Sequence, residues 1–232
     1  MRQEDAPLVR TLPLFAGASE TTVEKLLQAS FLQRFPAQVE LISEDQPADF
    51  FYVVLEGCIE LFANAGPKQS TAAIVRPVSS FAAAAVLRDG NYLLSARTLE
   101  PSRVLMIPGE SVRAAFAGDA AFAKAFALEL AAAYRRTMKA LNNQKLRTAI
   151  ERLANYLLQE HQTQGAAGNL TLPTEKQTLA SLLGMTSENL SRSFGALAAH
   201  GVKVTGREIQ LSDITSLETI AKPTPLIDDP MY

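Results

Sequence analysis

The sequence predicts an α+β protein with an N-terminal double-stranded β-helix (jelly roll), a long helix and a C-terminal winged helix-turn-helix. In the first half, short β-branched and aromatic runs alternate with turns, which is typical of jelly rolls and sandwiches. The stretch 120–141 contains neither glycine nor proline and is rich in alanine, which favours one long helix. Two short helical segments then flank Gly184, and two alternating strands flank Gly206. The expected parts of the chain are 1–118, 119–143, 144–222 and a flexible tail, 223–232.

Residues 8–34 are expected to be helical before the strands begin. Ser19 is a suitable N-cap, and apolar residues follow it at helical spacing. From about Phe35 the pattern changes to short strands rich in β-branched and aromatic residues. Gly57 interrupts the longest of these runs and predicts a bend or tight turn. The expected strands are 39–43, 50–62, 72–76, 93–99 and 104–107.

The long helix is expected to begin at Asp119, whose carboxylate can cap it, and to end near Asn142. Along it, one stripe of apolar and small side chains repeats at helical spacing. We predict that this stripe is the seam of a parallel two-helix homodimer, because small residues allow two helices to approach closely. Packing of the stripe on its own domain is the alternative. The predicted seam residues are Phe122, Phe126, Leu130, Ala133, Thr137 and Leu141.

A further helix is expected at about 144–164, and residues 175–197 have the pattern of a helix-turn-helix. Gly184 supplies the positive φ that the turn requires, and Thr186 is a suitable N-cap for the second helix. Leu190 and Phe194 lie on the stripe of that helix that should be buried. The strands on either side of Gly206, within 202–211, predict a wing.

The polar face left on the second helix suits the edges of DNA bases. Arg192 can donate two hydrogen bonds to guanine O6 and N7, and Glu188 can accept from cytosine N4. A helix-turn-helix places this part of the helix in the major groove, so double-stranded DNA is the expected partner. An ordinary helical hairpin with a polar face is the alternative. The predicted base-reading residues are Glu188, Ser191, Arg192 and Ser187, and the predicted phosphate contacts are Lys176, Thr186, Asn189 and Arg207.

The charge of the chain is weak for a DNA-binding protein. The formal net charge is −2, which argues against a globally basic binder. From Lys145 onward, the sequence contains eight basic and nine acidic residues. We therefore expect that binding at physiological salt needs a dimer and specific base contacts.

The sequence points to a cytoplasmic protein. No stretch reaches the 18 uninterrupted apolar residues of a membrane span, and the residues Met1–Asp5 do not have the pattern of a secretory signal. Cys58 is the single cysteine, so no disulfide can form within the chain, and we expect it to be a small buried residue. The two histidines, His161 and His200, are too few for a Cys/His zinc site.

A run from Asp49 through Gly57 to Phe62, a long helix, and the block Gly-Met-Thr-Ser-Glu-Asn-Leu-Ser-Arg at 184–192 together resemble the CRP/FNR superfamily. The resemblance covers nearly the whole chain. It implies a homodimeric transcription regulator with an effector-sensing β-roll. The pattern Glu188-x-x-Ser191-Arg192 is similar to the FNR branch, which reads TTGA-type half-sites, whereas the cyclic-AMP branch has Gly where Ser191 stands.

The resemblance allows several effectors, and the residues argue against two of them. Cyclic-nucleotide binders of this family carry a Gly-Glu pair, followed about ten residues later by Arg-Ser or Arg-Thr. In this chain Ser79-Ser80 replaces the first pair. The residues at the second position, near 91–94, are apolar or neutral. Arg97-Thr98 comes too late and is expected in the next strand, and Arg88 is expected in the turn before it. A cyclic nucleotide is therefore not expected. No cysteine precedes Cys58, which excludes the iron–sulfur sensor of the oxygen-sensing branch.

Haem remains an open alternative for the effector site. The block 172–192 looks like that of the nitrite and nitric-oxide reductase regulators, and some relatives in that group sense nitric oxide through haem. The β-roll contains no histidine, and His161 and His200 are expected at the surface. Methionine, tyrosine, cysteine or a terminal amine could still ligate haem.

The favoured function is a transcription regulator with DNA, a second copy of the chain and RNA polymerase as partners. The alternative is a module that binds a small molecule or cyclic nucleotide and acts on a protein partner, in which case apolar residues would be expected at positions such as Ser187 and Ser191. We expect no enzyme, because the sequence shows no nucleophile–base pair, no glycine-rich phosphate loop and no metal-binding motif.

Overall fold

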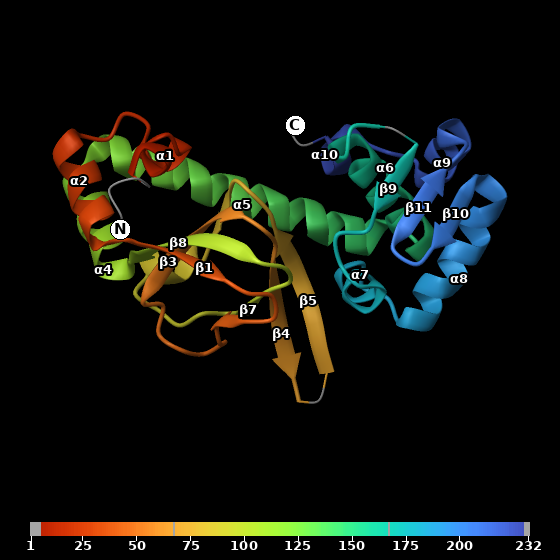
Figure 1. Cartoon of the computed structure of the whole chain (residues 1–232), viewed down its shortest axis with the longest axis horizontal. Coiled ribbons are helices and arrows are strands. Elements are labelled where there is room, and N and C mark those ends of the chain that lie inside the picture. The colour runs from red at the N-terminus through yellow and green to blue at the C-terminus, as the bar shows by residue number, and fades with distance from the viewer. Residues whose placement is uncertain (1–5, 67, 167, 230–232) are drawn as a thin grey trace. The chain divides into compact units, whose positions relative to one another are not determined.

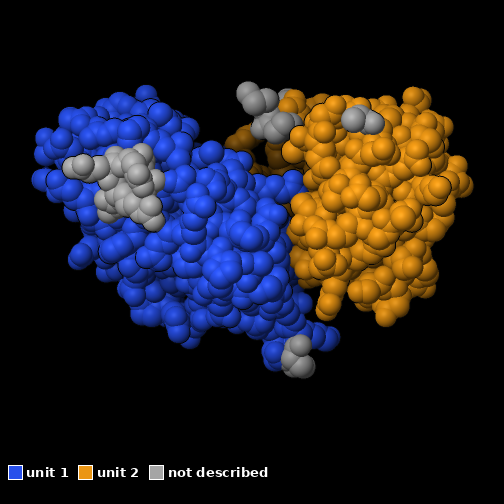
Figure 2. All heavy atoms as spheres, viewed as in Figure 1, with its two compact units in different colours: residues 1–134 blue, residues 135–232 orange. Residues whose placement is uncertain are grey.

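The structure is a computed structural model that describes residues 6–66, 68–166 and 168–229. It divides into two compact units, residues 1–134 and 135–232, which Figure 2 shows in blue and orange. Two predictions fall outside the described residues. They are the absence of a signal at residues 1–5 and the flexible tail over its last three residues. The division falls within the long helix.

The first unit is a β-sandwich of two four-stranded antiparallel sheets, as the sequence predicts (Figure 1). The strand orders are β1-β8-β3-β6 and β2-β7-β4-β5, and apolar side chains such as Phe51 and Ile59 fill the core. Gly57 has a φ of +87°, and a Cβ there would lie 2.3 Å from Ser102 Oγ, so the predicted tight turn requires glycine. The strands are β1 Phe31–Phe35, β2 Glu40–Ile42, β3 Phe50–Glu56, β4 Ile59–Ala65, β5 Lys68–Val75, β6 Ser79–Phe81, β7 Ser95–Thr98 and β8 Ser102–Pro108.

The N-terminal helical region is broken, so the prediction of helix throughout 8–34 is wrong in part. Pro13 begins a short 3-10 turn, and the chain is extended from Phe31 because strand β1 pairs with β8 there. Ser19 does cap the following helix, since its Oγ accepts from Thr22 N at 3.3 Å. The helical elements of this region and of the rest of the unit are α1 Ala6–Arg10, η2 Pro13–Phe15, α2 Glu20–Ala29, α3 Ala83–Leu87, α4 Gly109–Gly118 and the start of α5, Ala120–Leu146.

Helix α5 begins where predicted and ends four residues later than predicted. Asp119 Oδ1 accepts from the main-chain N–H groups of Ala121 and Phe122, both at 3.0 Å, while Oδ2 accepts from Ser19. The hydrogen bonds from Phe122 and Ser19 lower the pKa of the Asp119 carboxyl well below its usual range, so the cap stays charged.

Three of the predicted seam residues pack inside the first unit instead. Phe122 and Phe126 are fully buried, and Phe126 lies 5.2 Å from Phe51 between ring centroids. Leu130 packs against the same core. The prediction of a seam is wrong at Phe122 and Phe126, because residues of the roll and of α4 such as Phe51 and Phe116 already cover this face. Leu130 is half-buried. The structure leaves another stripe of α5 exposed or half-buried, made of Ala127, Leu128, Ala131, Tyr134, Met138 and Leu141, which we call the free stripe.

The second unit contains the end of α5 and a winged helix-turn-helix. Its three-stranded sheet has the order β10-β11-β9, so the short strand that contains Leu170 joins the wing. The core is formed by apolar residues of α6, α7, α8, α9 and the sheet. In the described part of the chain, no helix is both long and apolar enough to cross a membrane. The elements are α6 Ala149–Thr163, β9 Asn169–Thr171, α7 Lys176–Leu182, α8 Ser187–Leu197, η3 Ala198–His200, β10 Val202–Thr205, β11 Glu208–Leu211, α9 Ile214–Ala221 and α10 Pro225–Asp228.

Two expectations about the second unit are wrong. His161 is buried, and its Nε2 accepts from Gly168 N at 3.1 Å, because α6 packs against the loop that leads into β9. His200, expected at the surface, is half-buried and contacts Ser216.

The predicted flexible tail includes the short helix α10, whose Asp228 pairs with Arg147. Helix α9 was not predicted, although Asp213 supplies its N-cap by accepting from Ser216 N.

Candidate nucleic-acid interface

The turn between α7 and α8 is held in one geometry by glycine and by a neighbouring glutamine. Gly184 has a φ of +62°, and a Cβ there would lie 2.2 Å from Gln144 Oε1. Gln144 Nε2 in turn donates to Leu182 O at 3.2 Å. Arg152 donates to Leu183 O at 2.7 Å from the start of α6. Sequence patterns did not reveal these two positioning residues, because their partners Leu182 and Leu183 lie 38 and 31 residues further along the chain.

Helix α8 separates a buried face from a polar exposed face, as predicted. Thr186 caps it by accepting from Asn189 N at 3.2 Å. Leu190, Phe194 and Leu197 are buried in the core of the second unit. All four predicted base-reading residues are exposed and together line one shallow hollow on the surface of α8: Ser187, Glu188, Ser191 and Arg192.

Two charged side chains of this face have defined neighbours. Arg192 Nη2 donates to Asn189 Oδ1 at 2.8 Å, one turn away on the helix. A hydrogen bond from the Thr186 side chain, with one from its own main-chain N–H, lowers the pKa of the Glu188 carboxyl. Glu188 is therefore an ionised acceptor and Arg192 an oriented donor at neutral pH, which are the states that base recognition requires.

The four predicted phosphate contacts do not lie in equivalent environments. Lys176 is exposed, and its Nζ lies 5.8 Å from the ring centroid of Phe194. Thr186 and Asn189 are exposed but serve the cap and Arg192, respectively. Arg207, in the turn of the wing, donates to Leu172 O through Nε at 2.9 Å and through Nη2 at 2.7 Å. Its guanidinium thus anchors the wing to the segment before α7.

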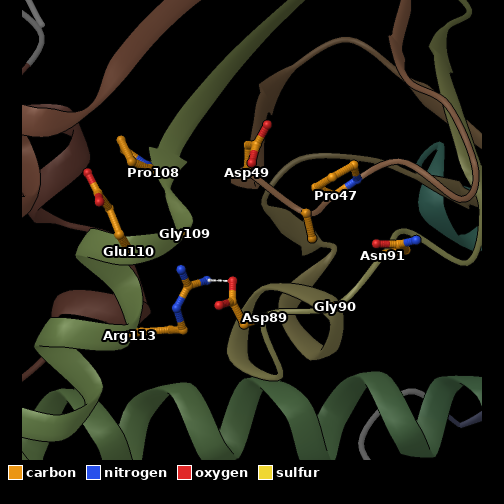
Figure 3. Close-up of a pocket in the computed structure, with 10 residues that line it drawn as sticks. Pro47, Asp49, Asp89, Gly90, Asn91, Pro108, Gly109, Glu110 and Arg113 are labelled. Atoms are coloured by element: carbon orange, nitrogen blue, oxygen red, sulfur yellow. Dashed lines mark ion pairs between the residues drawn. The ribbon is translucent and has the colours of Figure 1, made fainter.

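The β-roll has a polar hollow of about 490 Å³ on its surface (Figure 3). Asp49, Asp89 and Glu110 contribute carboxylates to the lining, and Arg113 pairs with Asp89 at 2.9 Å. Arg113 also donates to Val86 O at 3.0 Å. The hollow is acidic overall, so it does not suit a phosphate-bearing ligand.

Comparisons with known families agree with this arrangement of domains. Residues 32–119 match the cyclic nucleotide-binding domain family, and residues 151–220 match the Crp-like helix-turn-helix domain family. The chain has the domain pair of the CRP/FNR superfamily. Regulators of this family that carry the helix-turn-helix bind DNA and form homodimers. The comparisons do not single out the nitrite and nitric-oxide regulator branch.

Several solved structures of CRP/FNR-type regulators share the fold of this chain. FixK2 from Bradyrhizobium japonicum superposes with a TM-score of 0.73 at 23% identity, covering 84% of this chain and 98% of its own. A regulator assigned to the Crp/Fnr family from Eubacterium rectale gives a TM-score of 0.77 at 17% identity, covering 91% and 99%. A CRP-family regulator from Thermus thermophilus gives 0.69 at 20%, covering 83% and 97%. No protein among those with curated functions matches the chain.

Arg88 and Arg97, the two arginines considered above for a cyclic phosphate, lie outside the expected slot near 91–94. Arg97 lies in strand β7, as predicted, where its Nε donates to the buried Glu60 at 2.7 Å and its guanidinium lies 4.7 Å from the centroid of Phe62. Arg88 follows the last residue of α3, in the expected turn, and is exposed. Ser79 and Ser80 lie in β6, and Ser80 donates to Glu129 of α5 at 2.7 Å.

Two tyrosines and the cysteine of the roll, which belong to the residue types named above for haem, are packed in its core. Tyr52 and Tyr92 are buried, and burial raises the pKa of both phenols, which keeps them protonated at neutral pH. The Tyr92 hydroxyl donates to Phe50 O at 3.0 Å, and Tyr52 stacks on Phe81 at 4.8 Å. Cys58 is buried, as expected.

Proposed function

We propose that the protein is a homodimeric transcription regulator that reads a TTGA-like palindrome through α8, under control of an effector bound by the β-roll. The observation that carries the proposal is the exposed face of α8, where an ionised acceptor, two hydroxyls and an oriented arginine share one hollow. The rival, a module acting on a protein partner, would favour apolar residues there. The CRP/FNR fold supports DNA as the partner. On this proposal the protein works in the cytoplasm with RNA polymerase.

The free stripe of α5 supports dimer formation. Leu128, Tyr134 and Leu141 are 62%, 66% and 41% exposed, although each is large and apolar or aromatic. Ala127 and Ala131 are small and exposed between them, which allows a second helix to approach closely. The seam we propose therefore uses this face of the helix, which shares only Leu141 with the stripe that sequence spacing suggested.

The test of the proposed function is a binding titration with the full chain and a DNA duplex that carries two TTGA half-sites about one helical turn apart. Duplexes with single-base changes and with one half-site scrambled serve as matched controls. We expect saturable binding that falls when either half-site is altered. Equal binding to all the duplexes would contradict sequence-specific recognition.

Arg207→Ala is expected to weaken binding to all duplexes about equally and to reduce the slope of log affinity against log salt by about one. The reason is that Arg207 lies at the tip of the wing and would contact a phosphate, which carries no sequence information. Because Arg207 also bonds Leu172 O, thermal unfolding of the variant must be checked. A change in preference for one base would contradict a phosphate role.

Cyclic AMP and cyclic GMP are expected to show no saturable heat in calorimetry at micromolar protein. A buried cyclic phosphate needs a guanidinium, and Arg97 is already paired with Glu60. A protein of the same superfamily with a known cyclic nucleotide site serves as the positive control. A dissociation constant in the low micromolar range would contradict this prediction. If neither nucleotide binds, as expected, the effector is to be sought among other small molecules, including nitric oxide.

A further inference from the structure

The end of the chain folds back over the joint between α5 and α6. Helix α9 ends at Ala221, Lys222 adopts the left-handed conformation with a φ of +47°, and α10 follows. Sequence composition predicts a loose tail here. The described residues instead make contacts on both sides of the joint. Residues 221–229 are called the C-terminal clamp below.

The central contact of the clamp is a two-pronged ion pair between Arg147 and Asp228. Nη1 lies 2.8 Å from Oδ1, and Nη2 lies 2.5 Å from Oδ2. The side chains are only 7% and 14% exposed. Arg147 also donates to Asn143 Oδ1 on α5 at 3.1 Å, and Asp228 accepts from Thr224 N at 2.7 Å. A bidentate pair with little solvent access is geometrically specific and loses more than an exposed pair when one partner is removed.

Further contacts of the clamp reach α6 at one-turn intervals. Glu151 Oε1 lies 2.9 Å from Lys222 Nζ, and its other oxygen accepts from Thr148 in the cap of α6. The hydrogen bonds from Lys222 and Thr148 lower the pKa of the Glu151 carboxyl to about 2. The buried Asn155 donates to Ala221 O at 2.5 Å.

The clamp also reaches back onto α5, where Lys139 Nζ donates to Asp229 O at 2.5 Å. Only Arg147 and Thr148 separate the last residue of α5 from the first of α6. A two-residue joint is free to bend unless other contacts fix it. The clamp therefore connects two helices that the joint alone would leave adjustable.

We propose that the C-terminal clamp locks the α5–α6 joint and thereby sets the affinity for palindromic DNA. The part that concerns DNA rests on the proposed function. If two α8 helices must meet two half-sites at fixed spacing, a loose joint spreads them over many separations. Each productive pairing then costs more conformational entropy. A single half-site makes no such demand.

The first test is hydrogen–deuterium exchange of the full chain, which requires no DNA. Asp228→Asn is expected to speed amide exchange in residues 143–150 by about tenfold while leaving α8 unchanged. Arg147→Gln should give the same increase, and the double variant should exceed neither single variant, because both remove one contact. Glu218→Gln removes a negative charge from an exposed site on α9 and serves as the matched control.

Circular dichroism and thermal unfolding establish that each variant is folded before exchange is compared. Folded variants whose joint exchanges at the wild-type rate would overturn the proposal. Additive effects in the double variant would overturn it as well, because they would show that Arg147 and Asp228 act separately.

The second test compares DNA with two half-sites and DNA with one. Asp228→Asn is expected to weaken binding to the palindrome about tenfold and binding to the single half-site by less than twofold. Faster exchange with unchanged binding to the palindrome would overturn the regulatory role. If the wild-type chain binds neither duplex, the proposed function fails, and the exchange experiment still decides whether the clamp locks the joint.

Discussion

Arg192→Lys is expected to weaken binding to a TTGA-containing palindrome by about 1–3 kcal/mol per site and to relax the preference at one guanine. Lysine keeps the charge but loses the planar fork that donates twice to guanine O6 and N7. In the structure the fork is exposed on the polar face of α8, and Asn189 holds one of its nitrogens at 2.8 Å. The loss should therefore be specific to one base pair.

The measurement is a titration over single-base operator variants at two salt concentrations. Arg88→Lys makes the same chemical change at an exposed position of the β-roll and should leave DNA binding unaltered. Equal affinity and equal base preference in wild type and Arg192→Lys would show that α8 is not the recognition helix. A uniform loss over all sequences would instead assign Arg192 to a phosphate.

Tyr134→Glu is expected to convert the dimer to a monomer, raising the dissociation constant by at least about 100-fold. Tyr134 lies in the middle of the free stripe and is 66% exposed in one chain, so a charge there becomes buried only when a second helix covers it. Leu130→Glu is a poorer choice, because Leu130 packs against the core of its own roll and a charge there would also destabilise that unit.

Sedimentation of wild type and variant over a range of concentrations measures this effect. Ala140→Glu adds the same charge to an exposed position on another face of α5 and is the matched control. A dimer unchanged by Tyr134→Glu would place the interface elsewhere. Loss of the dimer in both variants would point to repulsion between chains in place of a buried seam.

The helix-turn-helix was predictable because its signals are local. Gly184 supplies the positive φ, Thr186 caps α8, and the apolar spacing of Leu190 and Phe194 fixes which face is buried. Every predicted base-reading residue is exposed as a consequence. Most strands of the roll were found for the same reason, since β-branched runs and turn residues mark them. Strands β1 and β6 were missed, because β1 lies in the stretch predicted as helix and β6 is a run of only three residues.

The use of each face of α5 could not be predicted, because helical spacing shows that a stripe exists but not what covers it. Phe122 and Phe126 form an apolar stripe that would suit either a partner helix or the roll. The β-roll strands and α4 bury it, and the free stripe stays exposed or half-buried within one chain.

The sequence by itself determined the order of the domains and the single cysteine. It also determined the turn at Gly184 and the polar face of α8, because both depend on residues close together in the chain. Only the tertiary structure decided that Arg207 anchors the wing, that Arg97 is bound to Glu60, and that Asp228 closes on Arg147. These pairs are 35, 37 and 81 residues apart in the chain. Charge and composition alone do not specify a partner over such separations, because the folded backbone brings the two groups together.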